Sequence, residues 1–142
     1  TYQHALQWRL RSSSRVAMTA TDLVFVYGTL RPGERNAHWL TRARHLGPAV
    51  SAAAYTLCDT GPYPAALPYG HTALVGDVYR VDTATQANLD TLESYPVFYS
   101  RRVIDTDYGP AWIYVWAAMR KRDWPVIIEG DWRRRTSRAG IQ

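Results

Sequence analysis

An apolar run that stops at a glycine limits the possible folds of this chain more than any other stretch. Residues 24–27 are β-branched or aromatic, and Gly28, Thr29 and Leu30 follow, ahead of an arginine and a Pro-Gly pair. This pattern predicts a buried strand that leads into a tight loop. Because glycine permits φ > 0 and has no Cβ to obstruct a ligand, we expect the amide N–H groups of Gly28, Thr29 and Leu30 to face a cavity and bind negatively charged oxygen. The alternative is that Gly-Thr only ends the strand.

The length and composition indicate one globular domain. A chain of 142 residues can bury a core without disulfides or metal, and 46% hydrophobic with 13% aromatic residues argues against disorder. Cys58 is the single cysteine, which excludes an internal disulfide and a cysteine-based metal cluster. No stretch approaches the roughly 20 consecutive apolar residues of a membrane span. We therefore expect a soluble, cytoplasmic protein that does not bind membranes.

The positive charge lies at the two ends of the chain. The net charge is +5, but residues 1–17 hold three arginines and residues 133–142 hold four, and neither stretch contains an acid. The remaining residues, 18–132, therefore carry a net charge of −2. We expect a leader or vector-derived extension at 1–17, one domain at 18–132 and a solvated basic tail at 133–142. A mildly acidic domain argues against nucleic acid as a partner.

The hydrophobic patterns predict six strands and two short helices. The expected strands begin with the run from Val24 and continue at residues 50–57, 73–81, 98–106, 111–119 and 124–128. Helices are expected at 36–45, where apolar residues recur at every third position, and at 84–92, where Asp82 or Thr83 provides the N-cap. Because βαβ alternation is absent, these elements indicate an α+β fold, a small mixed β-barrel with two or three short helices.

The segment at residues 60–68 contains three prolines and is expected to be a stiff loop without regular structure. Tyr63, held extended before Pro64, would let this loop wall a pocket. A plain surface connection is the alternative.

A glutamate in apolar surroundings is the strongest candidate for proton transfer. Glu93 lies at the end of the second expected helix, between Leu92 and an aromatic stretch that ends at Tyr99. Burial disfavours the charged form, so such a carboxyl has a raised pKa and is a better base. The alternative is a solvated residue at a helix end. The four histidines lack metal-ligand spacing and no glycine pattern for a nucleotide is present, so we expect neither a metal nor a cofactor.

Six short blocks carry a family resemblance. In chain order they are residues 27–31 (YGTLR), 61–65 (GPYPA), 76–79 (GDVY), 89–95 (LDTLESY), 99–101 (YSR) and 130–132 (GDW). Together they resemble the γ-glutamylcyclotransferase-like family, and most closely its γ-glutamylamine cyclotransferase and AIG2-like branch. Ser94 stands where glycine is common in that family, and Asp77 where glutamate is common.

The resemblance implies an enzyme that cyclises a small γ-glutamyl amide or amine to 5-oxoproline and releases the free amine, without a metal or cofactor. By position, Glu93 would be the general acid and base, and Tyr27, Gly28, Thr29 and Leu30 would hold the substrate. Tyr63 and Tyr99 are further candidates for substrate binding, with core packing as the alternative for Tyr99. A non-catalytic small-molecule or protein-binding module on the same barrel is the alternative function.

Overall fold

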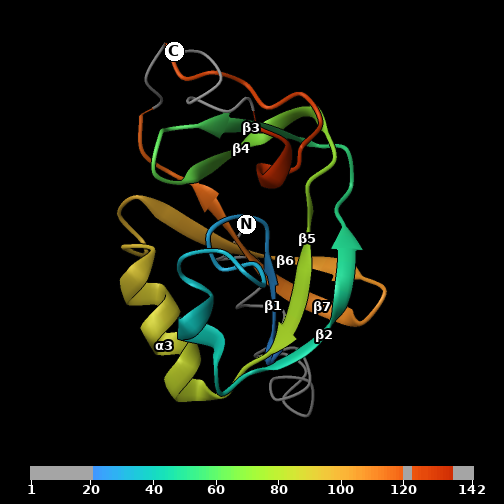
Figure 1. The fold of residues 1–142 in the computed structure, drawn as a ribbon, viewed down its shortest axis with the longest axis vertical. Helices are drawn as coiled ribbons and strands as arrows, with labels where there is room; N and C mark the ends of the chain where they lie inside the picture. Colours follow the sequence, from blue (N-terminus) through green and yellow to red (C-terminus); the bar gives the residue numbers. More distant parts are fainter. Residues whose placement is uncertain (1–20, 120–122, 136–142) are drawn as a thin grey trace, which may run out of the picture.

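A five-stranded sheet and a separate two-stranded sheet make up most of the computed structural model, which describes residues 21–119 and 123–135 (Figure 1). In chain order the described elements are β1 (Leu23–Val26), the 3₁₀ helix η1 (Ala37–Leu40), β2 (Arg44–Val50), β3 (Tyr55–Asp59), β4 (Pro64–Thr72), β5 (Val75–Arg80), α3 (Thr83–Leu92), β6 (Tyr99–Thr106), β7 (Gly109–Trp116) and the 3₁₀ helix η2 (Trp132–Arg134). The α+β class predicted from the sequence is confirmed.

The large sheet is open, so the predicted barrel is wrong. Its strand order is β2-β5-β1-β7-β6, with β1 parallel to β7 and all other neighbours antiparallel. Closure would require β2 to pair with β6, and these strands form the two edges instead. The chain between β2 and β5 pairs with itself as the β3–β4 hairpin, which lies at one end of the large sheet in Figure 1.

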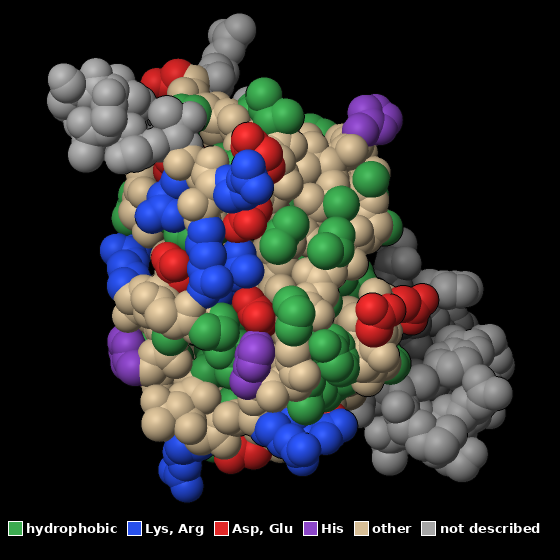
Figure 2. Space-filling model, turned by 45° about the vertical axis from the view of Figure 1, so that its right-hand side comes forward, with side chains coloured by type: hydrophobic (Ala, Val, Ile, Leu, Met, Phe, Trp, Pro, Cys, Tyr) green, Lys and Arg blue, Asp and Glu red, His purple; other side chains and the backbone are tan. Residues whose placement is uncertain are grey.

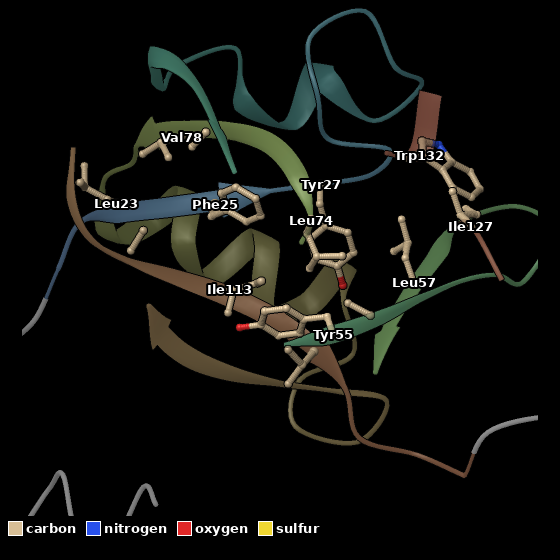
Figure 3. Close-up of a cluster of buried hydrophobic side chains, with 14 residues drawn as sticks. Leu23, Phe25, Tyr27, Tyr55, Leu57, Leu74, Val78, Ile113, Ile127 and Trp132 are labelled. Carbon is tan, nitrogen blue, oxygen red and sulfur yellow. The ribbon is translucent and has the colours of Figure 1, made fainter. Parts of the chain in front are cut away.

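Strand β1 is the centre of the sheet and is buried on both faces. Leu23 and Phe25 point into one apolar cluster, while Val24 and Val26 point into another on the opposite face. A strand that is buried on both faces has a continuous run of apolar residues instead of alternating apolar and polar ones. This explains the apolar run at residues 24–27. Figure 3 shows the first cluster, in which Trp132 from the C-terminal end lies beside Ile127 and near Leu57 of β3.

The second half of the predicted fold is largely confirmed. The expected helix at 84–92 is α3, and Asp82 caps it by accepting a hydrogen bond from the Thr85 amide at 2.7 Å. The expected hairpin is β6–β7, in register from Tyr99 opposite Trp116 to the turn before Gly109. The α3 helix lies beside the large sheet (Figure 1), and its Leu89 is fully buried in the second cluster.

The predicted loop at 60–68 is wrong in its second half. Residues from Pro64 onward form β4, which pairs with β3 from Asp59 opposite Pro64 to Thr56 opposite Leu67. Proline is tolerated at the first position of a strand and at irregular places in a ladder. Pro64 takes the first position, and Pro68 lies where the register shifts.

The predicted helix at 36–45 is also wrong. Only residues 37–40 are helical, as the 3₁₀ helix η1, and Leu40 is their one buried residue. Apolar residues at every third position match the three-residue turn of a 3₁₀ helix better than an α-helix. From Arg44 onward the chain pairs with β5 as the edge strand β2. The expected strand at 50–57 is correspondingly split between the end of β2 and β3, and the one at 124–128 is reduced to a bridge between Val126 and Cys58.

The expected boundary at residue 132 falls inside an element, because η2 continues to Arg134. Arg133 of η2 lies 3.2 Å from the Glu34 carboxylate, and its guanidinium also donates to the Pro32 carbonyl. Figure 2 shows basic side chains beside acidic ones on the face that it presents. The expected extension at 1–17 and the rest of the expected tail lie outside the described residues. Within the described chain, no helix is both long and apolar enough to cross a bilayer.

Candidate active site

A cavity of about 290 Å³ opens where β1, β4 and α3 end or begin. Its lining consists of apolar, aromatic and a few polar residues: Phe25, Val26, Tyr27, Gly28, Thr29, Leu30, Arg35, Asn36, Tyr63, Pro64, Leu92, Glu93, Ser94, Phe98, Tyr99 and Tyr114. All seven residues singled out in the sequence as site candidates are among them. Glu93 and the loop after β1, which are far apart in the chain, therefore meet at one cavity.

The loop after β1 is a tight turn, in which the Arg31 amide donates to the Gly28 carbonyl at 3.0 Å. Gly28 is required here for a different reason from the predicted one. Its φ is not positive, but a Cβ at this position would lie 2.4 Å from Cγ of Pro64. The missing side chain thus lets the first residue of β4 pack directly against the loop.

The amide N–H groups of Gly28, Thr29 and Leu30 have no hydrogen-bond acceptor among the described residues. Buried amides normally have a partner, so unpaired ones along a cavity wall are donors available to a ligand. The Thr29 hydroxyl accepts from the Asn36 side chain at 3.0 Å, and the Asn36 amide donates to the Thr29 carbonyl at 2.9 Å. These two bonds fix the backbone of the loop.

A buried ion network anchors the loop from behind. The Arg31 guanidinium lies 2.9 Å from Asp77 on β5 and 2.8 Å from Asp131 at the N-cap of η2, and only 6% of Arg31 is exposed. His45 on β2 lies 2.9 Å from the second oxygen of Asp77. Arg31 is therefore a structural residue, although it is next to the cavity loop in sequence.

Glu93 is positioned by the C-terminal turn of α3. It is the C-cap residue, and the helix ends in a Schellman motif in which the Ser94 amide donates to Thr91 and the Tyr95 amide to Asp90, at 3.1 and 2.9 Å. Ser94 has the left-handed φ of 54° that this motif requires. The turn reverses the chain directly after Glu93 and presents its side chain to the cavity.

The Glu93 carboxyl is half-buried, and burial raises its pKa from 4.5 to about 7. No described side chain or amide donates a hydrogen bond to this carboxyl, and no described cation pairs with it, so nothing offsets the loss of water. The C-terminal end of a helix dipole also disfavours negative charge, which acts in the same direction. Near neutral pH this group can accept or donate a proton with little driving force either way.

Three buried tyrosines surround Glu93, and each already donates its hydroxyl proton to a protein acceptor. Tyr27 donates to the Tyr114 carbonyl at 2.6 Å, Tyr99 to the Pro64 carbonyl at 2.7 Å, and Tyr114 to the Asp90 carboxylate at 2.6 Å. The Tyr114 hydroxyl also accepts from the Gln86 side chain at 2.7 Å, and the Tyr27 hydroxyl from the Ala66 amide. The Tyr99 hydroxyl oxygen can therefore accept a hydrogen bond from a ligand, and none of the three protons is available to Glu93.

Burial is the largest cause that raises the pKa values of these tyrosines, and neighbouring acidic groups raise them further. The neighbouring charge includes Glu93 for Tyr27, Tyr99 and Tyr114 alike. All three thus stay neutral at any pH at which the protein would work. A cavity with neutral acceptors, one weakly acidic carboxyl and a set of amide donors is equipped to bind a small zwitterion and move a proton within it.

The sequence profile of the gamma-glutamyl cyclotransferases of the AIG2-like type matches residues 24–134. The chain belongs to this enzyme family. The gamma-glutamylcyclotransferase family protein YtfP of Escherichia coli is 46% identical over 110 residues, which cover 77% of this chain and 94% of that protein. Its solution structure aligns with a TM-score of 0.64 over 78% of this chain and 95% of that chain, at 42% identity.

Two further solved structures share the cyclotransferase fold. A Pyrococcus horikoshii protein aligns over 79% of this chain and 90% of its own, with a TM-score of 0.69 and 28% identity. A mouse AIG2-like protein aligns over 78% of this chain and 86% of its own, with a TM-score of 0.68 and 22% identity, which supports the fold alone.

Several lining residues of this AIG2-like cyclotransferase were not predicted from the sequence. Asn36 and Arg35 follow the loop but belong to no block, and Tyr114 lies in the middle of an ordinary strand pattern. The nearest signal for Tyr114 was the hairpin itself, which places it near Tyr99 on the neighbouring strand. Among the described residues, no group of three or more His, Cys, Asp and Glu side chains is arranged to hold a metal ion.

Proposed function

We propose that this family member cyclises the γ-glutamyl group of a small amide or amine to 5-oxoproline and releases the free amine, with Glu93 as general base and then general acid. The observation that carries the proposal is the position of Glu93. This carboxyl has a pKa of about 7 and lines the same cavity as the unpaired amides of Gly28, Thr29 and Leu30.

In the first step the ionised Glu93 takes one proton from the substrate's α-ammonium group, which frees the nitrogen lone pair, and the resulting amine attacks its own γ-carbonyl carbon. The bond from nitrogen to carbon closes the five-membered ring, and the carbonyl electrons move onto oxygen. The amides of the loop after β1 stabilise this oxyanion. In the second step Glu93 returns its proton to the departing nitrogen, the bond to the leaving amine breaks and the carbonyl forms again. The ring nitrogen gives its second proton to the ionised Glu93, which passes it to the released amine, so that the amine leaves as its ammonium ion and Glu93 is ionised again.

The raised pKa removes most of the barrier to proton transfer. An α-ammonium with a pKa of about 7.7–8.0 and an ordinary glutamate near 4.3 differ by about 3.5 units, or about 5 kcal/mol. With Glu93 at about 7, the difference is about one unit, or roughly 1 kcal/mol. Holding the glutamyl chain in a ring-closing conformation can supply much of the remaining acceleration, because ideal orientation is worth up to about 7–11 kcal/mol.

The test is release of 5-oxoproline from a panel of γ-glutamyl amino acids, γ-glutamyl-ε-lysine, glutathione and γ-glutamylated aminoglycosides. We expect turnover of at least one member by the parent protein. Glu93→Gln keeps the size of the side chain and removes its proton chemistry, so we expect it to lose at least about 100-fold in kcat. Glu129→Gln, at an exposed glutamate outside the cavity lining, is the matched control and should retain activity.

Full activity of Glu93→Gln, with folding checked by circular dichroism, would remove Glu93 from the mechanism. Binding of panel members without 5-oxoproline release would favour a binding module on this fold.

The pH profile gives an independent check. The base must be ionised and the substrate amine must enter protonated, so kcat/KM should rise with pH through the Glu93 pKa of about 7 and fall above the pKa of the substrate amine. The rise on the acid side reports the pKa of Glu93, so its midpoint should be the same for every substrate. The alkaline limb should follow the pKa of each substrate's amine, and an acid limb near 4 would contradict the proposed state of Glu93.

A further inference from the structure

Arg35 is the one cation among the described residues that line the cavity. It is exposed, and its guanidinium has no ion pair or hydrogen-bond acceptor within the described chain. The other arginine of this loop differs completely, because Arg31 is buried between Asp77 and Asp131 and does not line the cavity. An unpaired cation beside a cavity is a candidate receptor for an anionic part of the substrate.

The backbone around Arg35 is held in place. The Asn36 amide and side chain both bond to Thr29, the Glu34 amide donates to the Arg31 carbonyl at 2.9 Å, and His38 Nδ1 lies 3.2 Å from the Arg35 carbonyl. Arg35 therefore keeps a fixed relation to the amide loop, although its side chain is exposed. Because the backbone of Arg35 is already fixed, less conformational entropy is lost when its side chain binds a ligand.

Arg35 lies toward the open side of the cavity, whereas the reacting groups lie further in. Gly28, Thr29 and Leu30 are buried and Glu93 is half-buried, while the exposed lining residues are Arg35, Ser94 and Phe98. A γ-glutamyl group that brings its amine to Glu93 and its γ-carbonyl to the amides must enter first. The leaving amine then extends outward, past Arg35.

We infer that Arg35 binds a carboxylate on the leaving amine, so that the preferred substrates are γ-glutamyl derivatives of amino acids instead of neutral or polycationic amines. This inference rests on the proposed function. A cation at the outer lining attracts an anionic leaving group and repels a polyamine, and Glu93 is the only described lining residue of opposite charge.

The inner donors are sufficient for the glutamyl group itself. Three unpaired amides and the Thr29 hydroxyl, whose proton has no acceptor among the described residues, make four donors. A γ-carbonyl oxygen and an α-carboxylate can share these four, which leaves Arg35 for a second carboxylate.

The experiment compares γ-glutamyl-alanine with γ-glutamyl-ethylamide, which differ by the carboxylate of the leaving amine. We expect the parent protein to prefer the alanine derivative in kcat/KM by about tenfold, and the preference to shrink with added salt. Arg35→Gln should lower kcat/KM for γ-glutamyl-alanine by about tenfold and leave the ethylamide within about twofold. Arg44→Gln removes the same charge from an exposed site outside the lining and should change neither.

Equal losses for both substrates would mean that Arg35 holds the glutamyl α-carboxylate, and no loss for either would mean that it binds neither; both results overturn the inference. Calorimetry of the two compounds with Glu93→Gln and with the double variant Glu93→Gln/Arg35→Gln separates this inference from the proposed reaction. A binding preference that disappears with Arg35 supports the carboxylate site even if the parent protein releases no 5-oxoproline. Equal binding of both compounds to Glu93→Gln would overturn it.

Discussion

At the scale of single residues, the ionised form of Glu93 destabilises the folded protein. Its carboxyl ionises with difficulty because burial raises its pKa to about 7, and no described donor or cation compensates. The folded state therefore binds the Glu93 proton more tightly than the unfolded state, whose carboxyl has a pKa of 4.5. The stabilisation that this difference gives is complete below the unfolded pKa and is lost as pH rises through about 7.

Glu93→Gln is accordingly expected to be more stable than the parent protein at alkaline pH. The advantage of the variant in free energy of unfolding should be about 2–3 kcal/mol larger at pH 8 than at pH 5, since the two pKa values differ by about 2.5 units. Urea unfolding at both pH values measures it. The exposed Glu129→Gln should show no such growth with pH, and an equal result for the two variants would contradict the buried state of Glu93.

The site residues that could be predicted from the sequence are those that stand in a recognisable local pattern. The glycine after an apolar run and the glutamate among aromatic residues are local patterns, and both lie at the cavity. Asn36, Arg35 and Tyr114 were missed because their part in the lining depends on which segments meet in space. The steric requirement for glycine at position 28 could not be predicted either, because it comes from Pro64, which lies on another strand.

At the scale of elements, the C-terminal end of α3 places Ser94 in a backbone conformation that is unfavourable for a residue with a side chain. The Schellman motif places Ser94 at φ 54°, a conformation in which a side chain costs about 1 kcal/mol and glycine costs little. This residue is the one that directs the chain away from Glu93.

Ser94→Gly should raise the free energy of unfolding by about 0.5–1 kcal/mol, because relief of the left-handed strain exceeds the added freedom of the unfolded chain. Thermal or urea unfolding checks this, and 5-oxoproline release should remain within a few fold because the motif is kept. Ser100→Gly, the same change inside β6, should instead destabilise by about 0.5–1 kcal/mol. Destabilisation by both changes would show that the Ser94 side chain contributes something else.

The elements that the sequence predicted best are those fixed by short-range chemistry. The N-cap at Asp82 defines α3, and the turn before Gly109 defines the β6–β7 hairpin. The helix expected at 36–45 and the loop expected at 60–68 failed because partners from elsewhere decide them. Pairing with β5 draws residues 44–50 into β2, and pairing with β3 makes a strand of a proline-rich segment.

At the scale of the whole molecule, the ion network of Arg31 joins segments that are distant in the chain. It links the cavity loop to Asp77 on β5 and to Asp131 near the C-terminal end of the described residues, and Trp132 beside it is buried in the core. The loop and the end of the domain are therefore expected to unfold together.

Arg31→Met should destabilise the protein by about 3–5 kcal/mol, because it leaves the buried Asp77 and the largely buried Asp131 without their cation. Urea unfolding gives the magnitude. Arg80→Met removes an arginine that pairs with Asp22 at 3.2 Å on a half-exposed surface, and it should change stability by less than about 1 kcal/mol. A similar small effect of Arg31→Met would contradict the anchoring role of the network.

Because the large sheet does not close, β2 and β6 each leave one row of backbone hydrogen-bonding groups without a strand partner in the described chain. Such edges can recruit a strand from another molecule and begin aggregation. Both carry the features that natural sheets use against this. The β2 edge has Pro48 and a register shift after His45, and the β6 edge has the exposed charged residues Arg102 and Asp105. The open sheet thus has two edges that resist self-association.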